Sequence, residues 1–284
     1  MLHASTIQLL RFHFSLFLLP VYLFALSQLQ DISWPSAIMV FIVLHLLVYP
    51  SSNGYNSYVD RDDGPIGGIL KPLQPTRQLF HITLVMDLAA VLLSFFLGWV
   101  FSLGIVLYIL ASRAYSSRRV RLKKYPVISF LTVFIFQGAL VFYISYQSIF
   151  PGTTFNIPIL PCIISGLLIG ALYPLTQIYQ HEDDRKDGVE TISMLLGKKG
   201  SFLFSMILFL TATLLLYLRF NNSEPGYFLL FLLIMLPVVL FFLYWMRKVW
   251  NDESQADFKN SLKMNILSTL CTTAFFIILI ILKF

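Results

Sequence analysis

Long apolar segments alternate with short polar loops along the whole chain. A helix needs about 20 consecutive apolar residues to cross a bilayer. Nine segments meet this requirement or come close to it: residues 7–29, 35–60, 77–98, 100–115, 126–147, 157–180, 200–220, 227–246 and 264–283. The third and fourth segments meet at Gly98 and Trp99, so a tight turn must join them. The pattern predicts an all-α, polytopic membrane protein with nine transmembrane helices.

The composition agrees with this class. The mean hydropathy is +0.77, and only 12% of the residues are charged, whereas a soluble domain carries about 25% charged residues. The first apolar segment lacks a small-residue cleavage site followed by a polar domain, so we expect a spanning helix and not a signal peptide. Cys162 and Cys271 lie in apolar segments without a CxxC partner, which indicates neither a disulfide nor a zinc site.

Positive charge is concentrated in one set of loops. Seventeen of the 20 lysines and arginines lie at or after the ends of the second, fourth, sixth and eighth segments, whereas opposite loops such as residues 147–156 carry almost none. Because lysine and arginine accumulate in cytoplasmic loops, we expect the N-terminus and these four loops in the cytoplasm. A bacterial inner membrane is the expected location. The same bias accounts for the net charge of +6, so we expect no nucleic-acid partner.

Acidic residues gather in two short windows on this same face. Eight of the fourteen acidic residues belong to them: Asp60, Asp62, Asp63, Glu182, Asp183, Asp184, Asp187 and Glu190. So many carboxylates in a chain with few charges are unfavourable unless a cation lies between them. We interpret the two windows as sites for magnesium ions that bind a diphosphate.

The first window continues the second apolar segment. Asn56, Asp60 and Asp63 have the spacing i, i+4 and i+7, so we expect them on one helix face, with Asp62 pointing elsewhere. One amide and two carboxylates suit magnesium, which usually takes one or two carboxylates and completes its shell with water and phosphate. The alternative is an ordinary polar helix end at the water interface. Carboxylates at a helix C-terminus oppose the helix dipole, however.

The second window follows the sixth apolar segment. If that helix continues through the window, five side chains fall within an arc of about 120°. They are Gln177, Gln180, Asp183, Asp184 and Asp187. Closely spaced aspartates repel one another unless a cation is present. Either Arg185 and Lys186 or a second magnesium ion supplies that cation.

A basic stretch lies between the fourth and fifth segments. Its five positive charges are Arg118, Arg119, Arg121, Lys123 and Lys124. The stretch is the strongest orientation signal in the chain and can contact anionic lipid headgroups. The alternative is that some of these side chains bind phosphate, as arginine and lysine commonly do.

These pieces together resemble the UbiA superfamily of intramembrane prenyltransferases, of the 4-hydroxybenzoate polyprenyltransferase type. The first motif of that family reads N-x-x-x-D-x-x-x-D. Asn56 and Asp60 match its first two positions, and the third falls on Gly64. The stretch from Tyr115 to Lys123 is similar to the tyrosine-then-basic motif that the family carries after its fourth helix.

The second motif of the family is an aspartate run followed by a glycine and a threonine. Asp184, Gly188, Thr191 and Gly197 fit that frame. Gln180 then stands where the family has its leading aspartate, and Asp183 and Asp187 offer a D-x-x-x-D pair in another register. The two departures, at Gly64 and Gln180, bear on how many metal ions the chain holds.

The resemblance implies one membrane-embedded domain over residues 1–284, with nine helices in a single bundle around a central cavity. It implies Mg2+-dependent transfer of an isoprenoid chain from a prenyl diphosphate to a hydrophobic or aromatic acceptor within the bilayer. The implied catalytic residues are Asp60, Asp184 and Lys123. The implied diphosphate-binding residues are Asn56, Tyr115, Arg119, Arg121 and Lys123. The implied metal ligands are Asn56, Asp60, Asp63, Gln180, Asp183, Asp184 and Asp187.

Two other functions are considered. An ion-coupled transporter also carries intramembrane carboxylates, but here the acidic residues gather at one face, and the sequence shows no inverted repeat with broken helices. A catalytically altered member of the same family is the other alternative.

Overall fold

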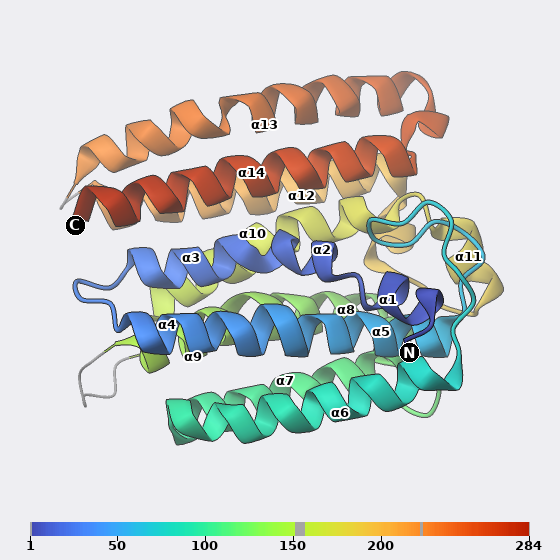
Figure 1. Ribbon diagram of the computed structural model, residues 1–284. Helices are drawn as coiled ribbons and strands as arrows, with labels where there is room; N and C mark the ends of the chain where they lie inside the picture. Colours follow the sequence, from blue (N-terminus) through green and yellow to red (C-terminus); the bar gives the residue numbers. More distant parts are fainter. Residues whose placement is uncertain (1, 151–156, 222–223, 284) are drawn as a thin grey trace.

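The computed structural model describes residues 2–150, 157–221 and 224–283. Within these ranges the chain is helical, apart from turns, loops and one isolated bridge between Ile66 and Ile69. The long helices lie side by side along one axis and form a single bundle (Figure 1). Nine helical spans in the described ranges are long and apolar enough to cross a membrane. The prediction of an all-α protein with nine such spans is therefore confirmed, while residues 151–156 of the loop 147–156 lie outside the described residues.

The first two spans are each built from several helical pieces. The first consists of α1 (Ala4–Leu10), α2 (Phe12–Ser15), the 3-10 turn η1 (Leu16–Leu18) and α3 (Leu19–Ser27). The second consists of α4 (Trp34–Phe41), the π-helical η2 (Ile42–Val48) and α5 (Tyr49–Asp60). The break between α1 and α2 falls at Arg11, whose φ of 48° lies in the left-handed region. For a residue with a Cβ this conformation costs roughly 1–2 kcal/mol.

The later spans overlap the predicted segments, although the seventh begins at Ile192 and not at residue 200, and the ninth begins at Phe258 and not at residue 264. They are α6 (Arg77–Ser94) with η3 (Phe95–Leu97), α7 (Trp99–Ser116), α8 (Pro126–Thr132) with η5 (Val133–Leu140) and α9 (Val141–Ile149), α10 (Ile159–Gln177), α12 (Ile192–Phe220), α13 (Pro225–Asn251) and α14 (Phe258–Lys283). Short helical turns occupy three loops: η4 (Leu122–Lys124), α11 (His181–Lys186) and η6 (Glu253–Gln255). The predicted tight turn is present at Gly98, whose φ of 91° suits glycine.

Two helices end earlier than the spacing arguments assumed. Helix α5 ends at Asp60 because Arg61 adopts φ 55° and its N–H bonds the carbonyl of Ser57. Helix α10 ends at Gln177, where a tighter turn from the Gln177 carbonyl to the N–H of Gln180 leads into the separate helix α11. The assumption that one helix runs through residues 183–187 is therefore wrong, and helical periodicity does not place these side chains.

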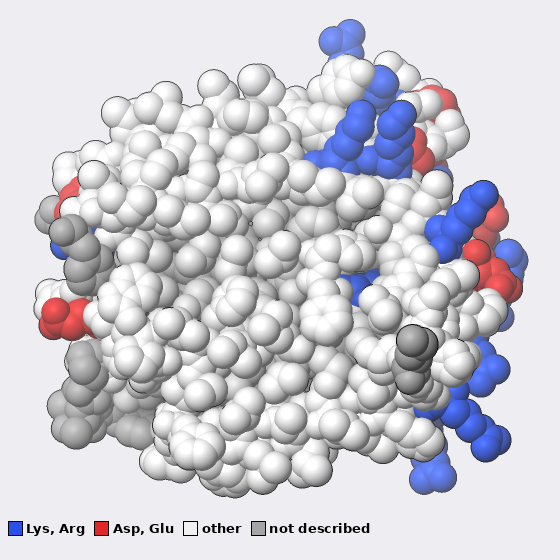
Figure 2. Space-filling model, viewed as in Figure 1, with Lys and Arg blue, Asp and Glu red and all other residues white. Residues whose placement is uncertain are grey.

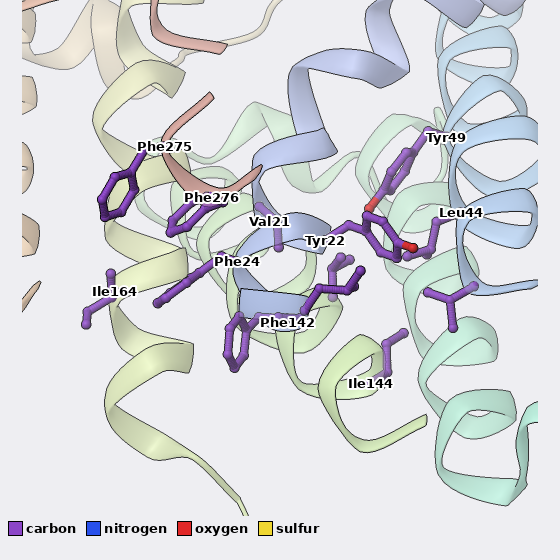
Figure 3. Packing of buried hydrophobic residues seen from close by; sticks show 14 of the residues in the cluster. Val21, Tyr22, Phe24, Leu44, Tyr49, Phe142, Ile144, Ile164, Phe275 and Phe276 are labelled. Atoms are coloured by element: carbon purple, nitrogen blue, oxygen red, sulfur yellow. The ribbon is translucent and has the colours of Figure 1, made fainter. Parts of the chain in front are cut away.

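Helix α3 packs against α9 and α14. Figure 3 shows its residues between α9 and α14, with Phe24 beside Phe142 and Phe276. The ring centroid of Phe24 lies 4.8 Å from that of Phe142 and 4.7 Å from that of Phe276. Helices in a membrane associate through such packing, since lipid is as apolar as the side chains. The aromatic layer fixes how far these helices stand apart, and hence where cavities remain.

Charged side chains are concentrated toward one end of the bundle. Figure 2 shows, on the visible face, lysine and arginine gathered toward the end where α1 and α11 lie in Figure 1, and a largely uncharged middle. Loops after even-numbered spans must share one end of an up-and-down bundle. Both acidic windows therefore reach the same end as the basic loops.

Two glycines allow η5 and α10 to touch. A Cβ added at Gly138 would lie 2.5 Å from the Cα of Gly166, and the Ser165 hydroxyl donates a hydrogen bond to the Gly138 carbonyl at 3.1 Å. We expect Gly138→Val to push the helices apart and to lower the free energy of unfolding by about 1–3 kcal/mol. Thermal unfolding in detergent measures this. The matched control is Gly226→Val, at a position with open space around it; equal melting temperatures for both variants would contradict the close contact.

Candidate active site

A polar cavity of about 270 Å³ lies at the charged end of the bundle. Side chains from α2, α5, α7, α10 and the adjoining loops line it. A second cavity of about 310 Å³ lies between α3, α10, α12, α13 and α14 and is almost entirely apolar. Phe17, Ile169 and Leu172 line both. The two cavities therefore adjoin, one suited to charged groups and the other to a hydrocarbon.

Three carboxylates from the two acidic windows line the polar cavity: Asp60, Asp62 and Asp184. The Asp60 side chain is only 4% exposed. One of its oxygens lies 2.6 Å from Lys123 Nζ and accepts a hydrogen bond from the Asn56 amide at 2.7 Å. Its other oxygen is buried and has no hydrogen-bond partner. The fold thus brings the two windows together at one cavity, where one buried carboxylate oxygen accepts no hydrogen bond from the described residues.

The other two carboxylates are not paired with any basic side chain that the structure describes. Neither Asp62 nor Asp184 takes part in any ion pair among the described residues. Burial, together with repulsion from Asp62, Asp60 and Asp187 and against the attraction of Lys123, raises the pKa of Asp184 to about 7. Burial, with repulsion from Asp60, raises the pKa of Asp62 to about 6. A cation placed between them would stabilise both charged forms.

The structure places Asp62, and not Asp63, in this cavity. Asp63 is exposed and accepts a hydrogen bond at 2.7 Å from Gln74 in the same loop. The expectation that Asp63 shares a face with Asn56 and Asp60 is wrong, because the left-handed Arg61 ends the helix before either residue. The expectation that Asp62 points away from Asn56 and Asp60 is wrong for the same reason, since Asp62 lines the cavity with them.

Most of the other predicted ligands in the second window are engaged outside the cavity lining. The Asp183 carboxylate lies 3.3 Å from Lys186 Nζ and is 41% exposed. Asp187 forms ion pairs with Arg118 and Arg121. Gln180 lines the cavity, but its amide donates a hydrogen bond at 3.0 Å to the Pro65 carbonyl. Of the three aspartates predicted as ligands in this window, only Asp184 lines the cavity.

Only some of the predicted diphosphate-binding residues line the cavity. Lys123, Asn56 and Tyr115 line the cavity, and the Tyr115 hydroxyl lies 2.5 Å from that of Tyr173. Arg121 is buried against Asp187 without lining the cavity, and Arg119 is exposed. Gln177, which the spacing argument also singled out, lines the cavity and has a buried carbonyl oxygen without a partner.

Sequence reasoning missed Arg11. It is the single charged residue in the span Ala4–Ser27 and is only 5% exposed. Its guanidinium lines the polar cavity and donates a hydrogen bond at 3.1 Å to the Asn53 carbonyl, while its Nε has no partner. None of the ion pairs among the described residues includes it. One arginine in an otherwise apolar segment is the signal that could have identified it.

A partly buried ion pair beside the cavity was also missed. Arg113 on α7 pairs with Asp87 on α6, and Ser51 on α5 donates a hydrogen bond to Asp87 at 2.6 Å. The guanidinium also lies 4.0 Å from the centre of the Tyr55 ring. These contacts tie together the three helices α5, α6 and α7. The sequence did contain a signal for this pair, because Asp87 and Arg113 carry opposite charges in two apolar segments that a tight turn joins.

Comparison with known proteins agrees with this architecture. A structure of a UbiA homolog from Archaeoglobus fulgidus bound to GPP and Mg2+ superposes with a TM-score of 0.71 at 18% identity, covering 98% of this chain and 99% of that one. The apo structure of a UbiA homolog from Aeropyrum pernix K1 gives 0.70 at 18% identity, with coverage of 94% and 98%. A digeranylgeranylglyceryl phosphate synthase structure gives 0.61 at 18% identity, with coverage of 98% and 96%.

These identities establish a shared fold only. No curated protein matches the sequence at a significant level. A sequence model of the UbiA prenyltransferase family, however, matches residues 16–268, which is most of the chain. The protein therefore belongs to the UbiA prenyltransferase family.

Proposed function

We propose that this protein transfers an isoprenoid chain from a prenyl diphosphate to a hydrophobic acceptor, for which an aromatic ring is the expected form, and releases diphosphate with the help of Mg2+. The observation that carries the proposal is the meeting of Asp60, Asp62 and Asp184 with Lys123 in one cavity that adjoins an apolar one. The Archaeoglobus fulgidus homologs were solved with GPP or DMAPP and Mg2+, which supports the same substrate class here.

The donor set fits magnesium held jointly with a diphosphate. Among the described residues no three His, Cys, Asp or Glu side chains form a complete metal site. Magnesium does not require one, because it usually takes one or two carboxylates and completes its octahedron with water and substrate phosphate. Asp62, Asp184 and the unpartnered oxygen of Asp60 offer hard oxygen donors of that kind. Bound magnesium supplies positive charge that stabilises the departing diphosphate.

The remaining polar groups would bind and orient the diphosphate. Lys123 is 8% exposed and is held at the cavity by Asp60, so its ammonium group is in place before charge develops on the leaving oxygen. The Asn56 amide and the Tyr115 hydroxyl lie in the same lining. Arg11 adds a second fixed positive charge. Groups positioned in advance in a site shielded from water stabilise developing charge more than mobile groups in water do.

The apolar cavity would take the isoprenoid chain. Departure of diphosphate from an allylic carbon leaves a carbocation that water would quench, so the reaction requires a dry site. Aromatic faces stabilise cations, and Phe14, Phe17 and Tyr173 line the polar cavity beside the metal ligands. We also propose that residues 1–284 act as one domain in a bacterial inner membrane, with the site at the cytoplasmic face.

The test measures diphosphate release from geranyl diphosphate by membranes that contain the protein, with and without Mg2+. We expect release that requires Mg2+, together with a prenylated product in the lipid extract that mass spectrometry detects. An ion-coupled transporter would release no diphosphate. If membranes containing the protein release no more diphosphate than control membranes, and the purified protein does not bind geranyl thiodiphosphate, the proposal is wrong.

Arg11 provides a test at the binding step. We expect Arg11→Gln to weaken binding of geranyl thiodiphosphate, in the presence of Mg2+, by about tenfold or more, since a hydrogen bond to a charged group contributes roughly 1.5–3 kcal/mol. Unfolding of the ligand-free protein should stay unchanged or shift to higher temperature, because an uncompensated buried charge is removed.

Calorimetric titration and thermal unfolding measure the two effects. Arg219→Gln is the matched control, because Arg219 lies in the last turn of α12, near Lys283 at the C-terminal end of α14 and away from the polar cavity. Unchanged affinity with a large loss of stability in Arg11→Gln would assign Arg11 a structural role.

A further inference from the structure

The two positions at which this chain departs from the aspartate motifs of its family lie against each other. Gly64 stands at the third position of the first motif, and Gln180 at the leading position of the second. The Gln180 amide donates its hydrogen bond to Pro65, the residue next to Gly64. A Cβ added at Gly64 would overlap the Asp183 carboxylate. Both departures therefore affect one place, where a loop and α11 are in direct contact.

Asp183 and Asp187, the D-x-x-x-D pair in the other register, do not replace the two motif aspartates that are absent at Gly64 and Gln180. Asp183 touches Gly64 on one side and pairs with Lys186 on the other. Asp187 pairs with two arginines, Arg118 and Arg121, and also lies 4.0 Å from Lys123 Nζ. Charge-assisted bonds of this kind are about twice as strong as neutral hydrogen bonds. A metal ion at Asp187 would have to displace both arginines from it.

The charges in the cavity match a single divalent ion. Lys123 Nζ lies 2.6 Å from Asp60 and 4.0 Å from Asp187. Asp62 and Asp184 line the cavity without an ion pair among the described residues, so these two carboxylates are the ones left for a divalent ion. The buried, unpartnered oxygen of Asp60 lies in the same lining and supplies a third donor. Lys123 and Arg11 would then bind the negatively charged diphosphate and take the role that a second metal ion would otherwise have.

We propose that this chain binds one divalent cation with its diphosphate substrate, at Asp60, Asp62 and Asp184, and not one cation at each acidic window. The inference rests on the proposed function, which supplies the diphosphate. It replaces the expectation of a separate ion at residues 180–187. Gln180 is then a positioning residue, which ties the loop after α5 to the chain that leads into α11.

The test counts bound metal directly. Mn2+ replaces Mg2+, since both prefer octahedral oxygen ligands, and electron paramagnetic resonance measures free Mn2+ over a titration of the purified full-length protein with saturating geranyl thiodiphosphate. We expect one Mn2+ per chain. Asp184→Asn should weaken that site at least tenfold. Asp183→Asn should keep a count of one, as should Glu182→Gln at an exposed position of the same helix.

The possible outcomes separate the inference from the function on which it rests. Two Mn2+ ions per chain with intact binding of the thiodiphosphate would overturn the single-ion site and leave the proposed function standing. Loss of the bound ion in Asp183→Asn would also overturn it, because it would place an ion in the alternative register. If neither Mn2+ nor the thiodiphosphate binds, the proposed function fails and the inference fails with it.

Discussion

Asp184→Asn is expected to lower the rate of Mg2+-dependent diphosphate release by at least about 10²–10³-fold, the usual effect of removing one group that stabilises charge in the transition state. The amide keeps the shape of the side chain but removes the negative charge that would bind the cation in the proposed site. Because burial already raises the pKa of Asp184 to about 7, the neutral side chain should not destabilise the fold. Diphosphate release in membranes and thermal unfolding in detergent measure the two properties.

The control for Asp184→Asn lies in the same short helix. Glu182→Gln removes the same charge from α11 at an exposed position, so it should leave release within about twofold, as expected of a surface charge screened by water. Asp60→Asn should lower the rate to a similar extent, and it should also destabilise the protein because it leaves Lys123 without its partner. A rate for Asp184→Asn that equals the rate of Glu182→Gln would remove Asp184 from the site.

Asp87→Leu is expected to destabilise the protein by up to about 3–5 kcal/mol, because it leaves the charge of Arg113, a side chain only 18% exposed, without its partner. The loss comes from the uncompensated charge and not from a missing contact. The double variant Asp87→Leu, Arg113→Met should therefore recover most of the stability, since apolar replacement of a whole buried pair is often neutral. Unfolding in mixed detergent micelles gives the free energies. If the double variant is no more stable than the single one, this explanation is wrong.

The Asp87–Arg113 pair also bears on the site. Ser51 bonds Asp87, and the next residue on α5, Ser52, bonds Ser112 of α7 at 2.6 Å within the cavity lining. Helix α5 carries Asn56 and Asp60 one and two turns further along. Loosening α5 against α7 should therefore weaken diphosphate binding as well as stability, although neither Asp87 nor Arg113 lines the cavity.

The sequence alone determined the class of fold and the end of the molecule that carries the site. Apolar segments long enough to span a bilayer can bury their backbone polar groups there only as helices or closed barrels, and segments of about 20 residues fit helices. Alternation then places the loops after the second and sixth spans at the same end, so Asp60 and Asp184 had to approach one another along the bundle axis. The meeting of both residues at one cavity could be predicted on that basis.

Only the tertiary structure decided which neighbouring residue faces the cavity. The spacing that favoured Asp63 and Asp183 holds inside a helix, but α5 ends at Asp60 and α10 at Gln177. A single left-handed residue, Arg61, turns Asp62 inward and Asp63 toward water. Pairings such as Lys123 with Asp60 and Arg121 with Asp187 join residues more than 60 positions apart. Such contacts depend on how the helices pack, which local sequence patterns do not specify.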